Sequence, residues 1–345
     1  RVVIAAILVW AGYGYLGASF AFAFSMGSGV VLAVYIVWKF VPEAFFIPSW
    51  SNLNIDEVFR FSWPLMAASL FGMIVGQVDT LMLQFFRGSS QVGLYQAAFP
   101  FAYLLTVGGS MFGSIFLSNA SRMVGSGNEG ELGRVYRTVT KWIAVFTVPL
   151  FVIFMAFPEA VLLLFGKQYT VVEDVLRVLS FGFLVSSVVG PFGNVFQALD
   201  RTKLNMALTG MLAMLNFVLN AVLIPQLGAM GAAVATTVSY LIYAGAGVAV
   251  LYWLFDIVPF KLLVWKVWFG AAIAALFVYL ISNTLFVVTP FWFFVVDLVL
   301  FGLLYLILLL VLRTLDEDDL LILRAVKRKT GRDIPWIEGL IRRFS

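Results

Sequence analysis

Long apolar runs follow one another along almost the whole sequence, and they limit the possible folds more than any other feature. A helix needs about 20 residues to cross the ~30 Å hydrocarbon core of a bilayer. Nine runs reach that length, and a tenth, residues 2–14, is too short. The runs are continuous rather than alternating, which favours helices over barrel strands, because a helix satisfies its own backbone hydrogen bonds in lipid. The long runs cover about residues 17–39, 61–86, 92–117, 141–165, 177–199, 204–225, 229–254, 264–283 and 291–312. The sequence therefore predicts an all-α integral membrane protein with about ten transmembrane helices.

The composition agrees with a bilayer as the solvent and excludes several kinds of chemistry. Of the 345 residues, 62% are hydrophobic and only 12% are charged, whereas soluble domains have about 45–50% apolar and ~25% charged residues. The chain has no Cys and no His, which removes disulfides, thiolate metal sites and the most common general base. We therefore predict no cofactor and no metal site. The net charge of +4 arises from basic residues in short loops and a tail, which suits anionic lipid headgroups rather than nucleic acid.

The basic residues are divided very unequally between alternate loops. Eighteen of the 22 Lys and Arg residues fall on one side of the predicted spans, three fall on the other, and Arg1 is unassigned. Cytoplasmic loops carry the excess of Lys and Arg. We therefore predict a multi-pass protein of the cytoplasmic (plasma) membrane with a cytoplasmic C-terminus. Loops 87–91 and 166–176 should face outward, and loop 119–140 should face the cytoplasm.

The segment from Asn216 to Thr237 reads N-F-V-L-N-A-V-L-I-P-Q-L-G-A-M-G-A-A-V-A-T-T, and its parts have clear physical roles. Asn216 and Asn220 share one helix face, and Pro225 is expected to end the span. The small residues that follow allow the next helix to pack closely. The segment therefore predicts two closely packed membrane helices with a polar face.

The same segment carries a resemblance to a known family. The chain resembles the MOP superfamily of MATE-like exporters, nearest to its polysaccharide and O-antigen flippase branch. In that branch an Asn-rich helix runs through an L-I-P turn into a G-x-x-G-A-A helix. The resemblance extends over nearly the whole chain from about Gly14. Further matching motifs, in order, are Pro64, Val78-Asp79-Thr80, Val92-Gly93-Leu94-Tyr95, Pro149, Phe165-Gly166 with Tyr169, and Gln197-Ala198-Leu199.

The resemblance implies a domain organisation, because members of this family have two six-helix lobes and some have two further helices. The chain then lacks most of its first lobe, so we expect it to be truncated at the N-terminus. The expected parts are a remnant of the N-terminal lobe with the end of helix 5 and helix 6 (1–40), a cytoplasmic linker (41–60), a complete C-terminal six-helix lobe (61–254), two additional transmembrane helices (255–312) and a basic amphipathic cytoplasmic tail (313–345).

Ionisable and amide side chains inside the spans are the candidates for a functional site, since such residues are costly in a bilayer. Asp79 shares a helix face with Gly72 and Gly76, and it either lines a cavity or caps a neighbouring helix near headgroup water. The amides on two other helices either line the same hydrated cavity or make ordinary interhelical hydrogen bonds. Asp297 lies in the last span, where a peripheral structural role is expected. The candidates for a substrate cavity are Asp79, Gln77, Asn194, Gln197, Asn216 and Asn220.

The resemblance implies a transporter rather than an enzyme. The implied function is the translocation of a lipid-linked oligosaccharide, carried on polyprenyl or dolichyl diphosphate, by alternating access, with membrane lipids and a coupling ion as further partners. A multidrug or toxin exporter of the same superfamily is an alternative. A membrane enzyme of polysaccharide assembly is another, but the sequence has no His base and no large extramembrane loop. The clustered acids at 316–319 follow the last span, where they are expected to start a helix.

Overall fold

The computed structural model describes residues 2–40, 55–127, 129–258, 264–285, 291–316 and 318–319. The chain divides into two compact units, residues 1–59 and 60–345. Most of the predicted linker 41–60 and of the predicted tail 313–345 lies outside the described residues. The last residues of that linker are helical and belong to α3, Ile55–Arg87.

The first unit is a short helix folded against a long one. It contains α1 (Val2–Leu8), a π-helical turn (Val9–Tyr13) and α2 (Gly14–Phe40). The chain reverses at Gly12 and Gly14, whose φ angles of 90° and 48° lie in the region that glycine adopts without strain. A Cβ on Gly17 would lie 2.8 Å from the Cβ of Leu8, so the absence of a side chain there allows the two helices to meet.

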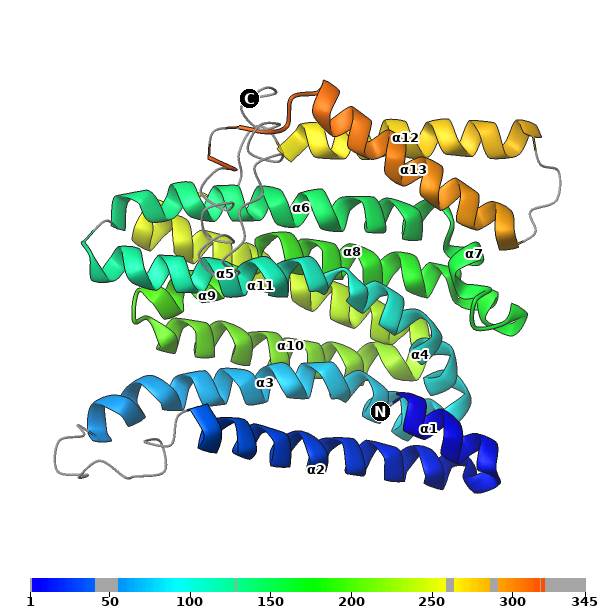
Figure 1. Cartoon of the computed structure of the whole chain (residues 1–345), viewed down its shortest axis with the longest axis horizontal. Helices are drawn as coiled ribbons and strands as arrows, with labels where there is room; N and C mark the ends of the chain where they lie inside the picture. Colours follow the sequence, from blue (N-terminus) through cyan, green and yellow to red (C-terminus); the bar gives the residue numbers. More distant parts are fainter. Residues whose placement is uncertain are drawn as a thin grey trace. The chain divides into compact units, whose positions relative to one another are not determined.

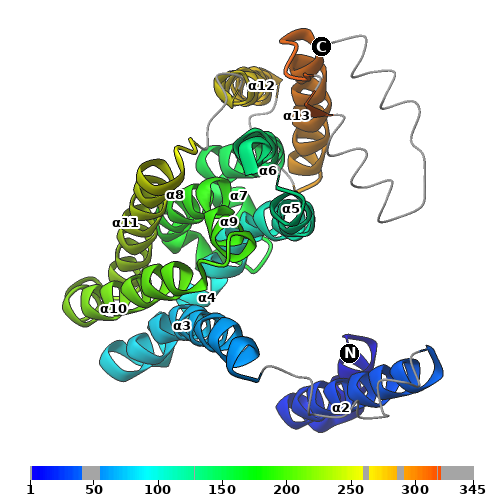
Figure 2. The ribbon, with the colours of Figure 1, turned by 90° about the vertical axis from the view of Figure 1, so that its left-hand side faces the viewer.

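The second unit is a bundle of long helices (Figures 1 and 2). Seven helical stretches in the described part of the chain are long and apolar enough to cross a membrane, and two shorter apolar helices follow them. This confirms the predicted all-α membrane protein. Besides α3, the unit contains α4 (Ser89–Leu104), α5 (Thr106–Gly125), α6 (Leu132–Ala156), α7 (Pro158–Leu162), α8 (Glu173–Val189), α9 (Phe192–Ala198), α10 (Thr202–Leu227), α11 (Ala229–Phe255), α12 (Val264–Leu285) and α13 (Phe291–Val311).

Two of the predicted spans are interrupted helices. The run predicted at 92–117 is divided at Leu105 into α4 and α5. The run predicted at 177–199 is divided at Gly190 and Pro191 into α8 and α9. Pro191 has no N–H, so the carbonyl of Ser187 loses the donor that a continuous helix would provide. Hydropathy does not detect these breaks because the apolar character continues through them.

Two predicted helix ends also differ from the structure. The span predicted at 141–165 is α6, which begins at Leu132 and ends at Ala156. Arg134 and Arg137 made residues 132–140 read as a loop, yet Leu132, Val135 and Tyr136 are buried and give this stretch an apolar face. Pro225 does not end α10, which continues to Leu227. Helix ends therefore follow packing here rather than local polarity.

The core lies among α4, α5, α6, α8, α9 and α11, where large side chains interlock. Tyr136, Phe116 and Phe192 are among the largest fully buried side chains. Helices α8 and α11 approach so closely that a Cβ on Gly182 would lie 2.8 Å from the Cα of Thr237. Small residues at such crossings are the usual basis of helix association in a membrane, where lipid removes most of the hydrophobic driving force.

Helices α12 and α13 pack beside α6, outside the group formed by the other helices of the unit (Figure 2). The rings of Phe151 on α6 and Trp268 on α12 have centroids 5.8 Å apart. The hydroxyl of Tyr305 on α13 donates to the carbonyl of Val145, 2.9 Å away. Aromatic contact and one hydrogen bond thus hold the last two helices against α6.

Just after α13 the chain is held to α6 by an acidic turn, Thr314–Asp319. The Nζ atom of Lys141 lies 2.6 Å from Asp319 and 3.0 Å from Asp316, and the Lys141 and Asp319 side chains are 1% and 0% exposed. Trp142 Nε1 also donates to Asp319, at 2.8 Å. Burial raises the pKa of Asp319, and the ammonium of Lys141 opposes that rise. The acids predicted to start a helix therefore serve first to pair a buried lysine.

The connections between helices lie at the two ends of the second unit (Figure 1). The α5–α6 and α9–α10 connections lie at one end, with the last residues of α11 and α13. The α3–α4 and α10–α11 connections lie at the other, together with α7. Most basic residues of the described helix ends and connections of this unit, such as Arg122, Arg134 and Arg201, are therefore at the same end. Which end faces the cytoplasm remains a prediction.

Candidate functional site

Asp79 is the centre of a buried polar cluster that joins four helices. It lies on α3 among Val75, Val78 and Leu83, and its side chain is 2% exposed. Tyr95 of α4 donates its hydroxyl to Oδ2 of Asp79 at 2.7 Å, and Thr236 of α11 donates its hydroxyl to the same oxygen at 2.6 Å. Asn220 of α10 donates its amide to Oδ1 at 2.6 Å. Both carboxylate oxygens are therefore held by donors from other helices.

A second layer of contacts links these donors to one another. Asn216 Nδ2 donates to the Thr236 hydroxyl at 3.0 Å, and Asn220 Nδ2 lies 3.2 Å from Asn216 Oδ1. Asn216 and Asn220 are fully buried. The side-chain oxygen of Asn220 has no hydrogen-bond partner. We call Asp79, Tyr95, Asn216, Asn220 and Thr236 the carboxylate cluster.

The carboxylate cluster has one negative group and no positive one among the described residues. The side chains that donate to Asp79 are neutral hydroxyls and one amide. An Asp at the centre of a membrane helix costs roughly 2.5–3.5 kcal/mol on insertion scales. Interhelical hydrogen bonds return roughly 0.6–1.7 kcal/mol each. The three donors together therefore return a stabilisation of about the same size as this cost, but they leave the negative charge of Asp79 without a counter-charge among the described residues.

An arginine holds the end of the helix pair that carries three members of this cluster. Arg87, at the end of α3, donates to the carbonyls of Ile224 and Gln226, at 3.3 and 2.9 Å, and also to that of Pro225. A cation at a helix C-terminus satisfies carbonyls that lack helical partners and opposes the helix dipole. Gln91 accepts the first N–H of α11, that of Ala229, at 3.0 Å. The α10–α11 turn is thus fixed to α3 and α4.

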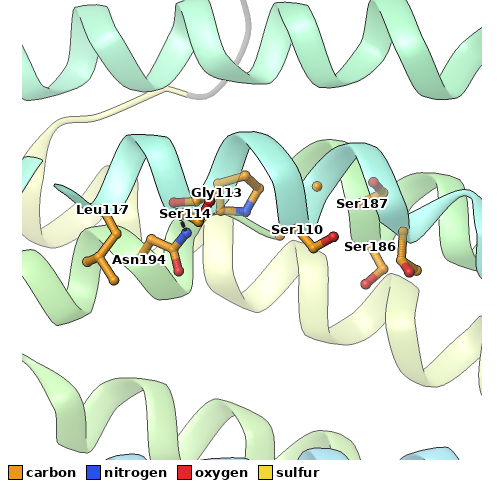
Figure 3. A pocket seen from close by; sticks show the side chains of 11 residues that line it. Ser110, Gly113, Ser114, Leu117, Ser186, Ser187 and Asn194 are labelled. Carbon is orange, nitrogen blue, oxygen red and sulfur yellow. Dashed lines mark hydrogen bonds between the residues drawn. The ribbon is translucent and has the colours of Figure 1, made fainter. Parts of the chain in front are cut away.

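A separate cavity of about 420 Å³ lies where the two interrupted helices meet. Figure 3 shows Ser110 and Ser114 of α5 on one side and Ser186, Ser187 and Asn194 of α8 and α9 on the other. Asn194 Nδ2 donates to the carbonyl of Gly113 at 2.8 Å. The lining contains hydroxyls, one amide and glycines, and no charged side chain. We call this space the hydroxyl cavity. Its full lining is Thr106, Gly109, Ser110, Gly113, Ser114, Leu117, Ser186, Ser187, Gly190, Pro191 and Asn194.

The six predicted cavity residues are divided between different places. Asp79, Asn216 and Asn220 come together in the carboxylate cluster, while Asn194 lines the hydroxyl cavity. Gln77 is exposed, because two residues turn a helix by about 200°, so its side chain lies on the face away from Asp79. Gln197 is half-buried and is not part of the lining of the hydroxyl cavity. The six residues therefore do not line one common cavity.

Sequence reasoning missed two members of the carboxylate cluster. Tyr95 stood in the V-G-L-Y motif and Thr236 in the A-T-T end of the Asn-rich segment, so both were visible as family-like positions. Neither type of residue signals a buried carboxylate by itself. Ser187 lay on a polar helix face together with Asn194, and that spacing was the available signal for the hydroxyl cavity.

Comparison with known proteins gives one family and several relatives. The profile of a family described as "Polysaccharide biosynthesis protein" matches residues 1–174. The "Probable low-salt glycan biosynthesis flippase Agl15" of Haloferax volcanii is 24% identical over 239 residues, which are 68% of this chain and 50% of that protein. The "Probable multidrug resistance protein NorM" of Thermotoga maritima is 25% identical over 201 residues, 55% of this chain and 42% of that protein. The chain thus spans about half the length of these relatives.

The fold is also that of a solved structure. The lipid II flippase MurJ, in an inward closed conformation, superimposes with a TM-score of 0.65 at 17% identity, covering 88% of this chain and 65% of MurJ. At this identity the likeness concerns the fold alone. Together with the family profile it confirms the resemblance on which the sequence analysis relied.

Proposed function

Since the chain belongs to the polysaccharide biosynthesis protein family, we propose that it takes part in moving a lipid-linked oligosaccharide across the cytoplasmic membrane by alternating access. A named glycan flippase among its relatives and the fold of a lipid II flippase support this proposal. The cargo would be an oligosaccharide on polyprenyl or dolichyl diphosphate, with the lipid tail remaining in the bilayer. We propose no chemical reaction for the chain, because these relatives are named as flippases and as a multidrug resistance protein.

The carboxylate cluster is the part of the structure on which we base the proposed transport mechanism. Asp79 joins α3, α4, α10 and α11, so a change in its charge changes how four helices are held together. A proton or a monovalent cation such as Na⁺ at Asp79 would remove the cost of the buried charge. The free oxygen of Asn220 would supply a further ligand to a cation. Occupancy of the cluster would thereby couple an ion gradient to the packing of the bundle.

The charge distribution supports an orientation. The end of the second unit that holds the α5–α6 and α9–α10 connections carries most of the Lys and Arg residues of the described helix ends and connections of this unit. We place this end, and with it the C-terminus, in the cytoplasm by the positive-inside rule. The carboxylate cluster lies in the half of the bundle near the α10–α11 turn, so an ion would reach it from the outer side.

The test is a flipping assay with the native gene product that contains these residues. Proteoliposomes would carry a polyprenyl diphosphate-linked oligosaccharide with a fluorescent label on the glycan, and a membrane-impermeant reductant would quench the label in the outer leaflet. We expect the protein to make the inner-leaflet pool accessible, and protein-free liposomes to protect that pool. Continued protection in the presence of correctly folded protein, with and without an imposed ion gradient, would refute the proposal.

The multidrug exporter is the second candidate, and the relative from Thermotoga maritima is the observation that favours it. The two functions differ in what the same vesicles accumulate. Import of a lipophilic cationic dye such as ethidium into inverted vesicles, without flipping of the labelled glycan lipid, would favour the exporter. Flipping without dye transport would favour the flippase.

A further inference from the structure

We propose that the hydroxyl cavity binds the uncharged sugar portion of the cargo, whereas it does not bind the diphosphate or the lipid. This inference rests on the proposed function, because it assigns one part of that cargo to one place in the fold. Helix α5 of the α4–α5 pair and the α8–α9 pair form the walls of the cavity, their polar groups face it, and no charged side chain lines it.

The first observation is that both walls are interrupted helices. Leu105 separates α4 from α5, and Gly190 with Pro191 separates α8 from α9. Leu105, Gly190 and Pro191 keep right-handed helical dihedrals, so each break is a short interruption of the helical hydrogen bonds and not an unwound segment. Such interruptions change the direction of a helix. The two interruptions therefore shape the walls of the cavity, and the polar groups on those walls indicate what it binds.

The second observation is a hydroxyl of the cavity wall that has no protein partner. Ser186 lines the cavity, is half-buried, and makes no side-chain hydrogen bond within the described part of the chain. Its hydroxyl can therefore both donate to a ligand and accept from one. The neighbouring Ser187 hydroxyl is also unpaired, but that atom is buried behind the wall and is not presented to a ligand.

The third observation is the kind of polar group on the opposite wall. Ser110 and Ser114 donate their hydroxyls to carbonyls of their own helix, those of Val107 and Met111, at 2.9 and 3.0 Å. Their oxygens still accept hydrogen bonds, because a hydroxyl oxygen has two lone pairs. Asn194 uses its amide nitrogen on Gly113 and keeps its oxygen as an acceptor. The cavity therefore offers neutral acceptors to a ligand that brings several donors, which a sugar does.

The lining also argues against the other parts of the cargo. Diphosphate recognition relies on Arg, Lys or a metal ion, and the lining contains no charged residue. A lipid tail or an apolar drug would leave the serine hydroxyls and the Asn194 amide of the wall without partners, which is unfavourable. The volume of about 420 Å³ lies in the ~300–1,000 Å³ range of small-ligand pockets. A neutral sugar fits this combination best.

The test measures binding to the purified protein in nanodiscs with two probes. One probe is a short-chain polyprenyl diphosphate carrying a neutral disaccharide, and the other is the same polyprenyl diphosphate without sugar. The first variant is Ser186→Ala, at a half-buried serine of the cavity wall. We expect it to weaken binding of the glycosylated probe about two- to tenfold, the value of one hydrogen bond, and to leave the bare diphosphate lipid unaffected. Because the lost hydroxyl has no protein partner, the melting temperature should stay the same or rise.

A second variant blocks the cavity, and a matched variant controls for it. Ser110→Leu places an apolar side chain in the cavity, while Ser69→Leu makes the same change at an exposed serine of α3 that donates to its own helix in the same way. We expect Ser110→Leu to abolish the preference for the glycosylated probe and Ser69→Leu to retain it. Size-exclusion elution identifies any variant that is misfolded.

The outcomes separate this inference from the proposed function. Wild-type protein that binds or flips the glycosylated probe, with Ser186→Ala and Ser110→Leu unchanged in their preference, would overturn the sugar site alone. An equal loss of affinity for both probes would also overturn it, because the cavity would then not distinguish a lipid with sugar from one without. Wild-type protein that neither binds nor flips the glycosylated probe would overturn both proposals.

Discussion

Asp79 shows what one residue does when its charge is surrounded by neutral groups. Three donors from three helices hold its oxygens, and none of them is basic. Hydrogen bonds orient the carboxylate and offset the cost of burying it, but they leave its negative charge in place. Asp297, on α13, is also buried, but it lies outside the group of helices that the carboxylate cluster joins. The two aspartates therefore allow a comparison of a coupling role with a structural one.

We expect Asp79→Asn to uncouple transport from the ion gradient. The asparagine is always neutral and still accepts hydrogen bonds, so the bundle should fold while the driven rate falls about tenfold or more, the scale of a coupling energy above ~1.4 kcal/mol. The measurement is the flipping rate under imposed Na⁺ or pH gradients. Asp297→Asn is the matched control and should keep the dependence on the gradient. A gradient response that survives in Asp79→Asn would remove the carboxylate cluster from the mechanism.

At the scale of the element, helices in this protein end and break where tertiary partners require it. Helix α6 begins nine residues before the predicted span because Val135 and Tyr136 pack into the core. The same helix carries Lys141, which would be an expensive buried cation without Asp316 and Asp319. The acidic turn thus fixes the end of α13 to α6 and makes the last two helices part of the second unit.

Removing Lys141 should destabilise the second unit far more than removing a surface charge. We expect Lys141→Met to cost about 3–5 kcal/mol, because it leaves Asp319 buried without its counterion. Arg134→Gln removes the 2.6 Å ion pair between Arg134 and Asp318, in which the arginine side chain is 49% exposed. This change should lower the free energy of unfolding by only about 0–1 kcal/mol. Thermal unfolding monitored by fluorescence compares the two variants. The double variant Lys141→Met with Asp319→Leu should recover much of the loss, and similar melting temperatures for both single variants would contradict this account.

At the scale of the whole molecule, the second unit has two chemically different ends. Helix ends and connections that carry most of the described basic residues of this unit gather at one end, and the α3–α4 and α10–α11 turns gather at the other. In a membrane this asymmetry decides how the bundle is inserted. Under the proposed function, it would also decide from which side an ion reaches Asp79.

Cysteine labelling tests the orientation without background, because the chain has no native Cys. Ser89 and Ser126 are both exposed, at opposite ends of the second unit. We expect an impermeant maleimide to label Ser89→Cys in intact cells and to label Ser126→Cys only after the cells are permeabilised. The opposite pattern would reverse the orientation proposed here. Equal labelling of the two sites in permeabilised cells controls for reactivity.

The sequence by itself determined the class of fold and the main helices. Long apolar runs allow only one structure in lipid, since each must satisfy its backbone internally, and the described helices follow these runs. The polar stripe of Asn216 and Asn220 was also readable, because helical spacing places both on one face. Hydropathy and periodicity are local properties, so they predict what depends on neighbours in the chain.

Only the tertiary structure decided which polar residues meet. Asp79 contacts Asn220 and Thr236 from sequence distances of 141 and 157 residues, and Lys141 meets Asp316 from a distance of 175. No local pattern encodes such pairs, because they depend on how helices cross and rotate against one another. The same rotation turned Gln77 away from the carboxylate cluster and placed Asn194 in a different cavity. The chain's polar residues were therefore visible in the sequence, but their division into a carboxylate cluster and a hydroxyl cavity was set by helix packing.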